Sequence, residues 1–113
     1  MQMITYVGII SFAVVGTAIL TRAMMTYAIH RCIVDVPNER SSHAAPTPRG
    51  GGLAMVVVFC AGLMFLWARD DLAVRLVLAI GGSSLIAAGV GFCDDHGHVS
   101  ARVRVSFHCA AAF

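Results

Sequence analysis

Three uncharged apolar runs constrain the fold of this chain more than any other feature. They cover residues 1–21, 50–68 and 76–93. Each run is close to the ~20 residues that a helix needs to cross a hydrocarbon core of roughly 30 Å. A buried helix of a soluble protein can match one such run, but three in succession predict membrane spans.

The composition agrees with a membrane protein. Hydrophobic residues make up 58% of the 113 residues and charged residues 12%, whereas roughly a quarter of an average soluble domain is charged. No basic residue precedes the first apolar run and no small-residue cleavage motif follows it, so we interpret this run as a retained span and not as a signal peptide. The sequence therefore predicts an all-α fold of polytopic transmembrane helices, with spans at about residues 4–28, 50–68 and 72–93.

The C-terminal end carries the start of a fourth apolar run. Residues 105–113 make up only nine positions, which is too few to cross a membrane. We therefore expect residues 1–113 to be the N-terminal portion of a larger transmembrane domain, truncated within its fourth span. Because three helices alone bury few side chains between them, we expect missing helices or further copies of the chain as partners.

The distribution of positive charge predicts an orientation. The chain has eight arginines and no lysine. Arg69 and Arg75 flank the connection between the second and third runs, and the other six arginines follow the first or the third run. By the positive-inside rule, this asymmetry places the N-terminus outside and the polar stretches at about residues 30–49 and 94–104 in the cytoplasm. Because the arginines are dispersed and not interleaved with aromatic residues on one face, nucleic acid is not an expected partner. The six arginines that follow the first or the third run are Arg22, Arg31, Arg40, Arg49, Arg102 and Arg104.

Small residues and cysteines in the apolar runs indicate packing. Ser83, Ala87 and Gly91 recur every four residues, which predicts a helix face that another helix can approach closely. The four cysteines show no CxxC spacing, and two of them lie within or at the end of apolar runs. We interpret them as small apolar fillers and not as a zinc site or a disulfide framework.

The first polar stretch, "DVPNERSSHAAPTPRGGG", covers residues 35–52. Its three prolines restrict the backbone, and its three glycines allow positive φ and close backbone approach where the second span begins. A glycine-rich helix start can bind phosphate through exposed N–H groups, although three glycines alone are not specific. From composition alone, a shaped binding loop and a solvated connector fit this stretch equally well.

The second polar stretch, "GVGFCDDHGHVSARVRV", covers residues 89–105. Asp94 and Asp95 directly follow an apolar span, where two adjacent carboxylates repel each other and the C-terminal end of the helix dipole. A Mg²⁺ ion would compensate them, since it is usually held by one or two carboxylates together with substrate phosphates. The alternative is an ion-paired structural cluster neutralised by Arg102 and Arg104. The nearby histidines, His96 and His98, are more typical of solvent-facing residues than of metal ligands.

Together, the two polar stretches resemble the N-terminal part of the polyprenyl-phosphate N-acetylhexosamine-1-phosphate transferase family. This family includes the undecaprenyl-phosphate N-acetylglucosamine-1-phosphate transferases of O-antigen and teichoic acid synthesis and the phospho-N-acetylmuramoyl-pentapeptide transferase of peptidoglycan synthesis. The resemblance covers essentially the whole chain. It implies a multi-pass enzyme of the bacterial inner membrane that moves N-acetylhexosamine-1-phosphate from a UDP-sugar to undecaprenyl phosphate, releases UMP and needs Mg²⁺.

The resemblance also implies roles for individual residues. Asp94 and Asp95 match the aspartate pair of the family, which implies that they bind Mg²⁺ and act in catalysis, as a base or as a nucleophile. Several residues of the first stretch match loop positions of the family, and His43 stands where the peptidoglycan branch usually has a lysine that faces phosphate. Arg49 is included for its positive charge at the same surface. The candidates for binding substrate phosphate are Asp35, Asn38, Arg40, His43 and Arg49.

The later cytoplasmic aspartates and the histidine-rich loop of the family have no counterpart in these 113 residues. The resemblance therefore predicts that the chain is inactive on its own. Two other functions stay open at this point. One is a small helical membrane subunit that binds lipid phosphate without turnover, and the other is a transporter fragment.

The predicted orientation can be tested by mapping cysteine accessibility. We expect single cysteines placed at residues 35–50 and 94–104 to be protected from an impermeant reagent added outside. Cysteines at residues 69–72 should react with it. Labelling of the first loop from outside would reverse the orientation.

Overall fold

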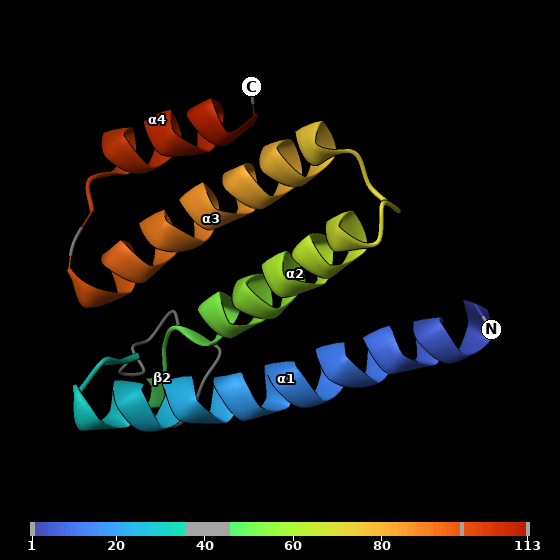
Figure 1. The fold of residues 1–113 in the computed structure, drawn as a ribbon. Coiled ribbons are helices and arrows are strands. Elements are labelled where there is room, and N and C mark those ends of the chain that lie inside the picture. Colours follow the sequence, from blue (N-terminus) through green and yellow to red (C-terminus); the bar gives the residue numbers. More distant parts are fainter. Residues whose placement is uncertain (1, 36–45, 98, 113) are drawn as a thin grey trace.

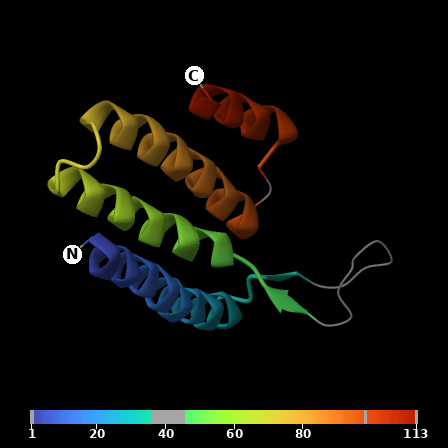
Figure 2. The same cartoon turned by 90° about the vertical axis from the view of Figure 1, so that its right-hand side faces the viewer.

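The computed structural model describes residues 2–35, 46–97 and 99–112, and these form a row of helices with one short hairpin. Each helix lies beside the next one in the chain, with alternating direction (Figures 1 and 2). The prediction of an all-α fold with apolar spans is confirmed. The elements are α1 (Gln2–His30), β1 (Val34–Asp35), β2 (Thr47–Pro48), α2 (Gly51–Ala68), α3 (Val74–His96) and α4 (Ala101–Ala112).

Helices α1, α2 and α3 are long and apolar enough to cross a membrane. At ~1.5 Å per residue, the 29 residues of α1 extend about 43 Å, which exceeds a hydrocarbon core of roughly 30 Å. The apolar span of this helix covers Met3–His30 and includes Arg22. The 12 residues of α4 extend only about 18 Å, as expected of a segment too short to span.

The apolar surface of the three long helices is mostly exposed within the described residues. The buried side chains are few and mostly small, such as Ala28 and Ala54, which are 1% and 2% exposed. Small residues also set the close contacts between helices, since a Cβ on Gly16 would lie 3.4 Å from Val58. A large uninterrupted apolar surface is costly in water and favourable in lipid. The exposed belt of Ile, Val, Leu, Phe and Met side chains is therefore the surface of a membrane protein.

Helices α1 and α2 end in the same hydrogen-bonded turn. After α1, the Cys32 N–H donates to the Ile29 carbonyl and the Ile33 N–H to the Ala28 carbonyl, at 3.1 Å and 2.8 Å. This is the Schellman pattern, with Cys32 in the left-handed conformation at φ 57°. The same pattern ends α2, where Asp70 has φ 59°. These turns satisfy the last helical carbonyls and reverse the chain.

A two-stranded ladder closes the first polar stretch. Strands β1 and β2 are antiparallel, with Val34 opposite Pro48 and Asp35 opposite Thr47. The Arg49 N–H then donates to the Ile33 carbonyl at 3.1 Å. Both ends of the stretch are thereby held together beside the end of α1, and α2 begins immediately after it. The sequence did not predict these strands, because two residues are too few to show an alternating pattern.

The alternating helix directions bring the described parts of both polar stretches to one end of the row. The hairpin, the start of α2, the end of α3 and the start of α4 all lie at this end (Figure 1). We call it the loop end. The α2–α3 turn lies at the opposite end, where Arg69 pairs with Asp71 at 3.0 Å. Two stretches that are far apart in sequence can therefore contribute to one site.

Close contact at Gly16 gives a prediction about helix packing. Gly16→Leu should push α1 away from α2 and lower the free energy of unfolding by roughly 1–3 kcal/mol, because the new side chain meets Val58. Gly8→Leu on the same helix is the matched control, since a Cβ at Gly8 meets nothing within 4 Å. Unfolding in detergent, followed by circular dichroism, measures both. Equal destabilisation by the two variants would contradict this packing.

Candidate functional site

The last turn of α3 carries Asp94, Asp95 and His96 at the loop end, and the helix stops at Gly97 in an extended conformation. Adjacent residues on a helix point about 100° apart, so neighbouring side chains face different surroundings. The structure separates the three side chains accordingly. Each of them meets a different part of the molecule.

Asp94 faces α4. Its Oδ2 atom lies 2.7 Å from Nη1 of Arg104, and its Oδ1 atom accepts the N–H of Val99 at 3.2 Å. The Asp94 side chain is 29% exposed and that of Arg104 is 45% exposed. Arg104 therefore compensates Asp94, as the ion-pair interpretation of the sequence predicted. Among the described residues, Arg102 forms no such pair.

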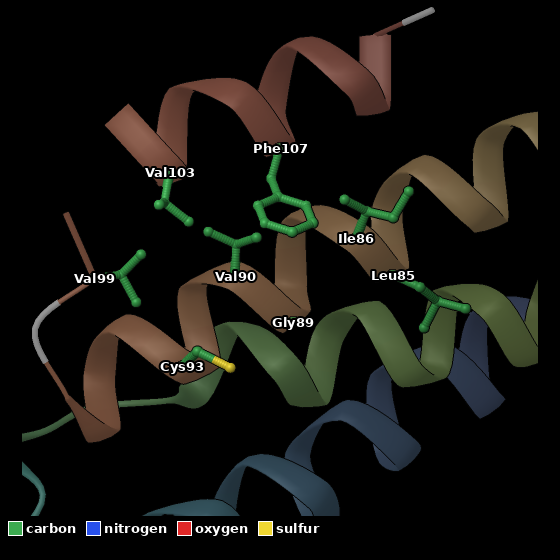
Figure 3. Close-up of a pocket in the computed structure, with 8 residues that line it drawn as sticks. All are labelled: Leu85, Ile86, Gly89, Val90, Cys93, Val99, Val103 and Phe107. Atoms are coloured by element: carbon green, nitrogen blue, oxygen red, sulfur yellow. The ribbon is translucent and has the colours of Figure 1, made fainter. Parts of the chain in front are cut away.

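Apolar contacts place Arg104 beside α3. Val103 and Phe107 are one helical turn apart on α4 and point toward Ile86 and Val90 of α3 (Figure 3). An open apolar cavity of about 390 Å³ lies between the two helices. The ion pair and this apolar contact together hold the start of α4 against the end of α3. The cavity is lined by Leu85, Ile86, Gly89, Val90, Cys93, Val99, Val103 and Phe107.

Asp95 faces a second cavity, of about 270 Å³, between α3 and the start of α2. Gly50 adopts φ 93° immediately before α2, and no side chain caps this helix start. The Leu53 N–H donates to the Gly50 carbonyl at 3.2 Å. The first N–H groups of a helix that have no partner within it can bind an anion. Within the described residues, no hydrogen bond or ion pair involves the Asp95 carboxylate. The lining residues are Gly50, Gly52, Leu53, Val56, Ala87, Ala88, Gly91, Phe92 and Asp95.

The small-residue face of α3 contributes to the same cavity. Ala87 and Gly91 line it, and a Cβ on Gly91 would meet nothing within 4 Å. The sequence predicted close helix approach along this face. Helix α2 approaches α3 closely at Gly81, which does not belong to this series, and a Cβ there would be 3.7 Å from Leu63. Ala87 and Gly91 therefore border the cavity.

His96 faces α1. Its Nδ1 atom lies 2.8 Å from the Phe92 carbonyl, and its Nε2 atom lies 3.1 Å from the Tyr27 hydroxyl. A carbonyl can only accept, so Nδ1 carries the proton and donates. In the neutral ring, Nε2 then accepts from the Tyr27 hydroxyl. His98 lies outside the described residues.

The candidate residues of the first stretch are only partly described. Asn38, Arg40 and His43 lie outside the described residues. Asp35 belongs to β1, and the structure describes its backbone alone. Arg49 is exposed at the loop end, directly before the glycine run. The structure thus brings Arg49, the glycine run and the aspartate pair to one end of the helices.

The donor set fits Mg²⁺ held by a carboxylate together with water or phosphate oxygens. Among residues 2–35, 46–97 and 99–112, no three His, Cys, Asp or Glu side chains lie close enough to share a metal ion. A closed metal site made only of these side chains is therefore not formed. Mg²⁺ commonly takes one or two carboxylates and completes its shell with water and substrate phosphate. Asp95 offers one such carboxylate on a cavity wall.

Tyr27 is a residue that sequence reasoning missed. It lies near the end of α1, on the loop end of an apolar span, where aromatic residues with a polar group are typical of membrane interfaces. This position at the end of an apolar span was the sequence signal that could have identified Tyr27. Its contact with His96, 69 positions away, follows only from the arrangement of the helices.

Comparison with known proteins finds a curated relative. The chain is similar to the decaprenyl-phosphate N-acetylglucosaminephosphotransferase of Mycolicibacterium smegmatis (strain ATCC 700084 / mc(2)155). The two are 30% identical over 107 aligned residues, which cover 82% of this chain and 26% of the relative. The chain thus spans about a quarter of the length of the curated relative that it matches. No protein-family model matches the chain, and no solved structure matches it.

This similarity supports a relationship to the polyprenyl-phosphate hexosamine-phosphate transferases, the family that both polar stretches resemble. It does not distinguish among the members of that family. Together with the three apolar helices, the similarity indicates a membrane protein that is related to a transferase.

The Asp94–Arg104 pair gives a prediction about α4. Arg104→Gln should loosen the start of α4 by up to ~1 kcal/mol, because exposed ion pairs contribute about that much. Hydrogen exchange of the amides in Ala101–Ala112 should then become about two- to fivefold faster. Arg102→Gln, on the same helix, should leave the exchange unchanged. Equal acceleration in both variants would show that the pair does not hold α4.

Proposed function

We propose that this chain contributes part of the active site of a membrane transferase. The enzyme moves N-acetylhexosamine-1-phosphate from a UDP-sugar to undecaprenyl phosphate and releases UMP. The observation that carries the proposal is the cavity between Asp95 and the uncapped glycine start of α2. It joins the two stretches that resemble the family, and the curated relative is named for a reaction of this kind.

Both substrates of this reaction are anionic, so the site must attract phosphate. The N-terminal end of α2 provides N–H groups and the positive end of a helix dipole. Arg49 lies directly before this helix start and adds a positive charge. In the proposal, Arg40 and His43 add further charge from the first polar stretch, and Asp35 and Asn38 complete that binding loop.

Asp95 is the proposed catalytic residue. An oxygen of the lipid phosphate attacks the β-phosphorus of the UDP-sugar, the bond between this phosphorus and the UMP oxygen breaks, and UMP leaves. Asp95 either takes the proton from the lipid phosphate or attacks the phosphorus itself before the lipid does. Both roles need a carboxylate that faces the cavity and is not already paired.

Mg²⁺ is the proposed cofactor, and Asp95 is its first ligand. When bound, the ion would neutralise charge that develops on the leaving phosphate. Asp94 would be a weaker candidate for a second ligand, since its two oxygens already accept from the Arg104 guanidinium and the Val99 N–H. The proposed setting is the bacterial inner membrane, with the N-terminus outside and the loop end in the cytoplasm, where UDP-sugars are found.

Substitution of the aspartates tests this function when the chain is restored to a complete homologous transferase. Asp95→Asn should lower UMP release from UDP-N-acetylglucosamine and undecaprenyl phosphate by about 10²–10⁴-fold, because the amide can neither accept the proton nor attack. Asp94→Asn should lower it as well, by less if Asp94 mainly holds α4. Asp70→Asn is the matched control, since Asp70 lies in the turn at the opposite end and Asn tolerates its positive φ.

Each outcome decides between functions. Loss of turnover in Asp95→Asn, with membrane insertion intact and Asp70→Asn unaffected, supports the transferase. Near-normal activity in both Asp94→Asn and Asp95→Asn would make the pair structural. Binding of undecaprenyl phosphate without any UMP release would favour a lipid-phosphate-binding subunit instead.

A further inference from the structure

We propose that Tyr27 and His96 form a positioning pair, which holds the last turn of α3 so that Asp95 faces the start of α2. This inference rests on the proposed function of Asp95, and it assigns a role in that reaction to a residue of α1. Tyr27 itself does not line the cavity. It acts through His96, the direct neighbour of Asp95 in the chain.

The pair is a link between helices that are not neighbours. Helix α2 lies between α1 and α3 in the row (Figure 1). At the loop end, the Tyr27 hydroxyl donates to Nε2 of His96 at 3.1 Å, and the two ring centroids are 5.9 Å apart. The guanidinium of Arg31 lies 5.8 Å from the centre of the Tyr27 ring. Arg31 directly follows α1, its N–H donates to the Tyr27 carbonyl at 3.0 Å, and the cation–π contact favours one orientation of the Tyr27 ring.

A chain of contacts leads from Tyr27 to the cavity wall. His96 donates from Nδ1 to the Phe92 carbonyl at 2.8 Å, and its ring lies 4.1 Å from that of Phe92. Phe92 lines the same cavity as Asp95. An acceptor bond at Nε2 and a donor bond at Nδ1 together define one ring orientation and one tautomer. The last turn of α3 is thus tied to α1 through His96.

This turn needs external support. The C-terminal end of a helix is negative, and two carboxylates placed there weaken the turn. Gly97 ends the helix in an extended conformation, so the chain beyond it does not continue the helical bonds. Two links support the turn from different helices, Arg104 of α4 through Asp94 and Tyr27 of α1 through His96. Asp95 lies between the two anchored residues and is left facing the cavity.

The test removes the link without touching the cavity, and it uses the same complete homologous transferase that carries this chain. Tyr27→Phe should lower kcat for UMP release by about fivefold, the effect of losing one neutral hydrogen bond, with little change in KM for the UDP-sugar. Tyr6→Phe, which alters the other tyrosine of the chain at the far end of α1, is the matched control and should leave kcat unchanged. His96→Gln should retain more activity than His96→Ala, because its amide can accept from Tyr27 and donate to the Phe92 carbonyl.

A double-mutant cycle separates positioning from general loss of stability. If Tyr27 acts through His96, Tyr27→Phe combined with His96→Ala lowers kcat no further than His96→Ala alone. Additive losses, or equal effects of Tyr27→Phe and Tyr6→Phe, would overturn the proposal.

Absence of UMP release would contradict the proposed function but would not test the Tyr27–His96 pair. A spectroscopic measurement tests the pair separately. In protein labelled with ¹⁵N-histidine and ¹³C-aspartate, Tyr27→Phe should shift the Nε2 signal of His96 and the carboxyl signal of Asp95. The variants His96→Gln and Asp95→Asn assign these signals. An unchanged Asp95 signal in Tyr27→Phe would show that the pair does not position this carboxylate.

Discussion

The structure depends on the need to satisfy backbone hydrogen bonds where no water is present. Inside a hydrocarbon core, an N–H or carbonyl without a partner costs several kcal/mol, so each span must form a helix that bonds within itself. The three long helices meet this condition. Polar chemistry is then confined to the ends, where helices stop and the chain turns. The Schellman turns after α1 and α2 and the short β1–β2 ladder provide hydrogen-bond partners for backbone N–H and carbonyl groups at these ends.

The same constraint concentrates the candidate site. Because successive spans alternate in direction, the first and second polar stretches meet at one end, and the start of α2 lies against the end of α3. The uncapped N-terminus of α2 and the carboxylate of Asp95 border one cavity. The positive end of a helix dipole and a negative charge therefore lie on the same cavity. Such a surface suits a phosphate and a cation at once.

Much of the fold was predictable from the sequence, and the site only in part. Uncharged runs of the right length identify spans without any tertiary information, and the polar stretches identify where chemistry is expected. The ion-pair and metal interpretations of Asp94 and Asp95 could not be separated from sequence, because charge counting treats adjacent carboxylates alike. The structure divides the pair, with Asp94 bound to Arg104 and Asp95 facing the cavity. The β1–β2 ladder was not predicted, since it consists of only two pairs, Val34 with Pro48 and Asp35 with Thr47.

The sequence by itself determined that the chain forms apolar helices with polar ends, because hydropathy and length decide whether a segment is stable in lipid. It also marked the two stretches that resemble the family. Only the tertiary structure decided which carboxylate faces the cavity and that Tyr27 reaches His96 from a helix that is not its neighbour. The physical reason is that side-chain direction on a helix is local, whereas the group it meets depends on how distant segments pack.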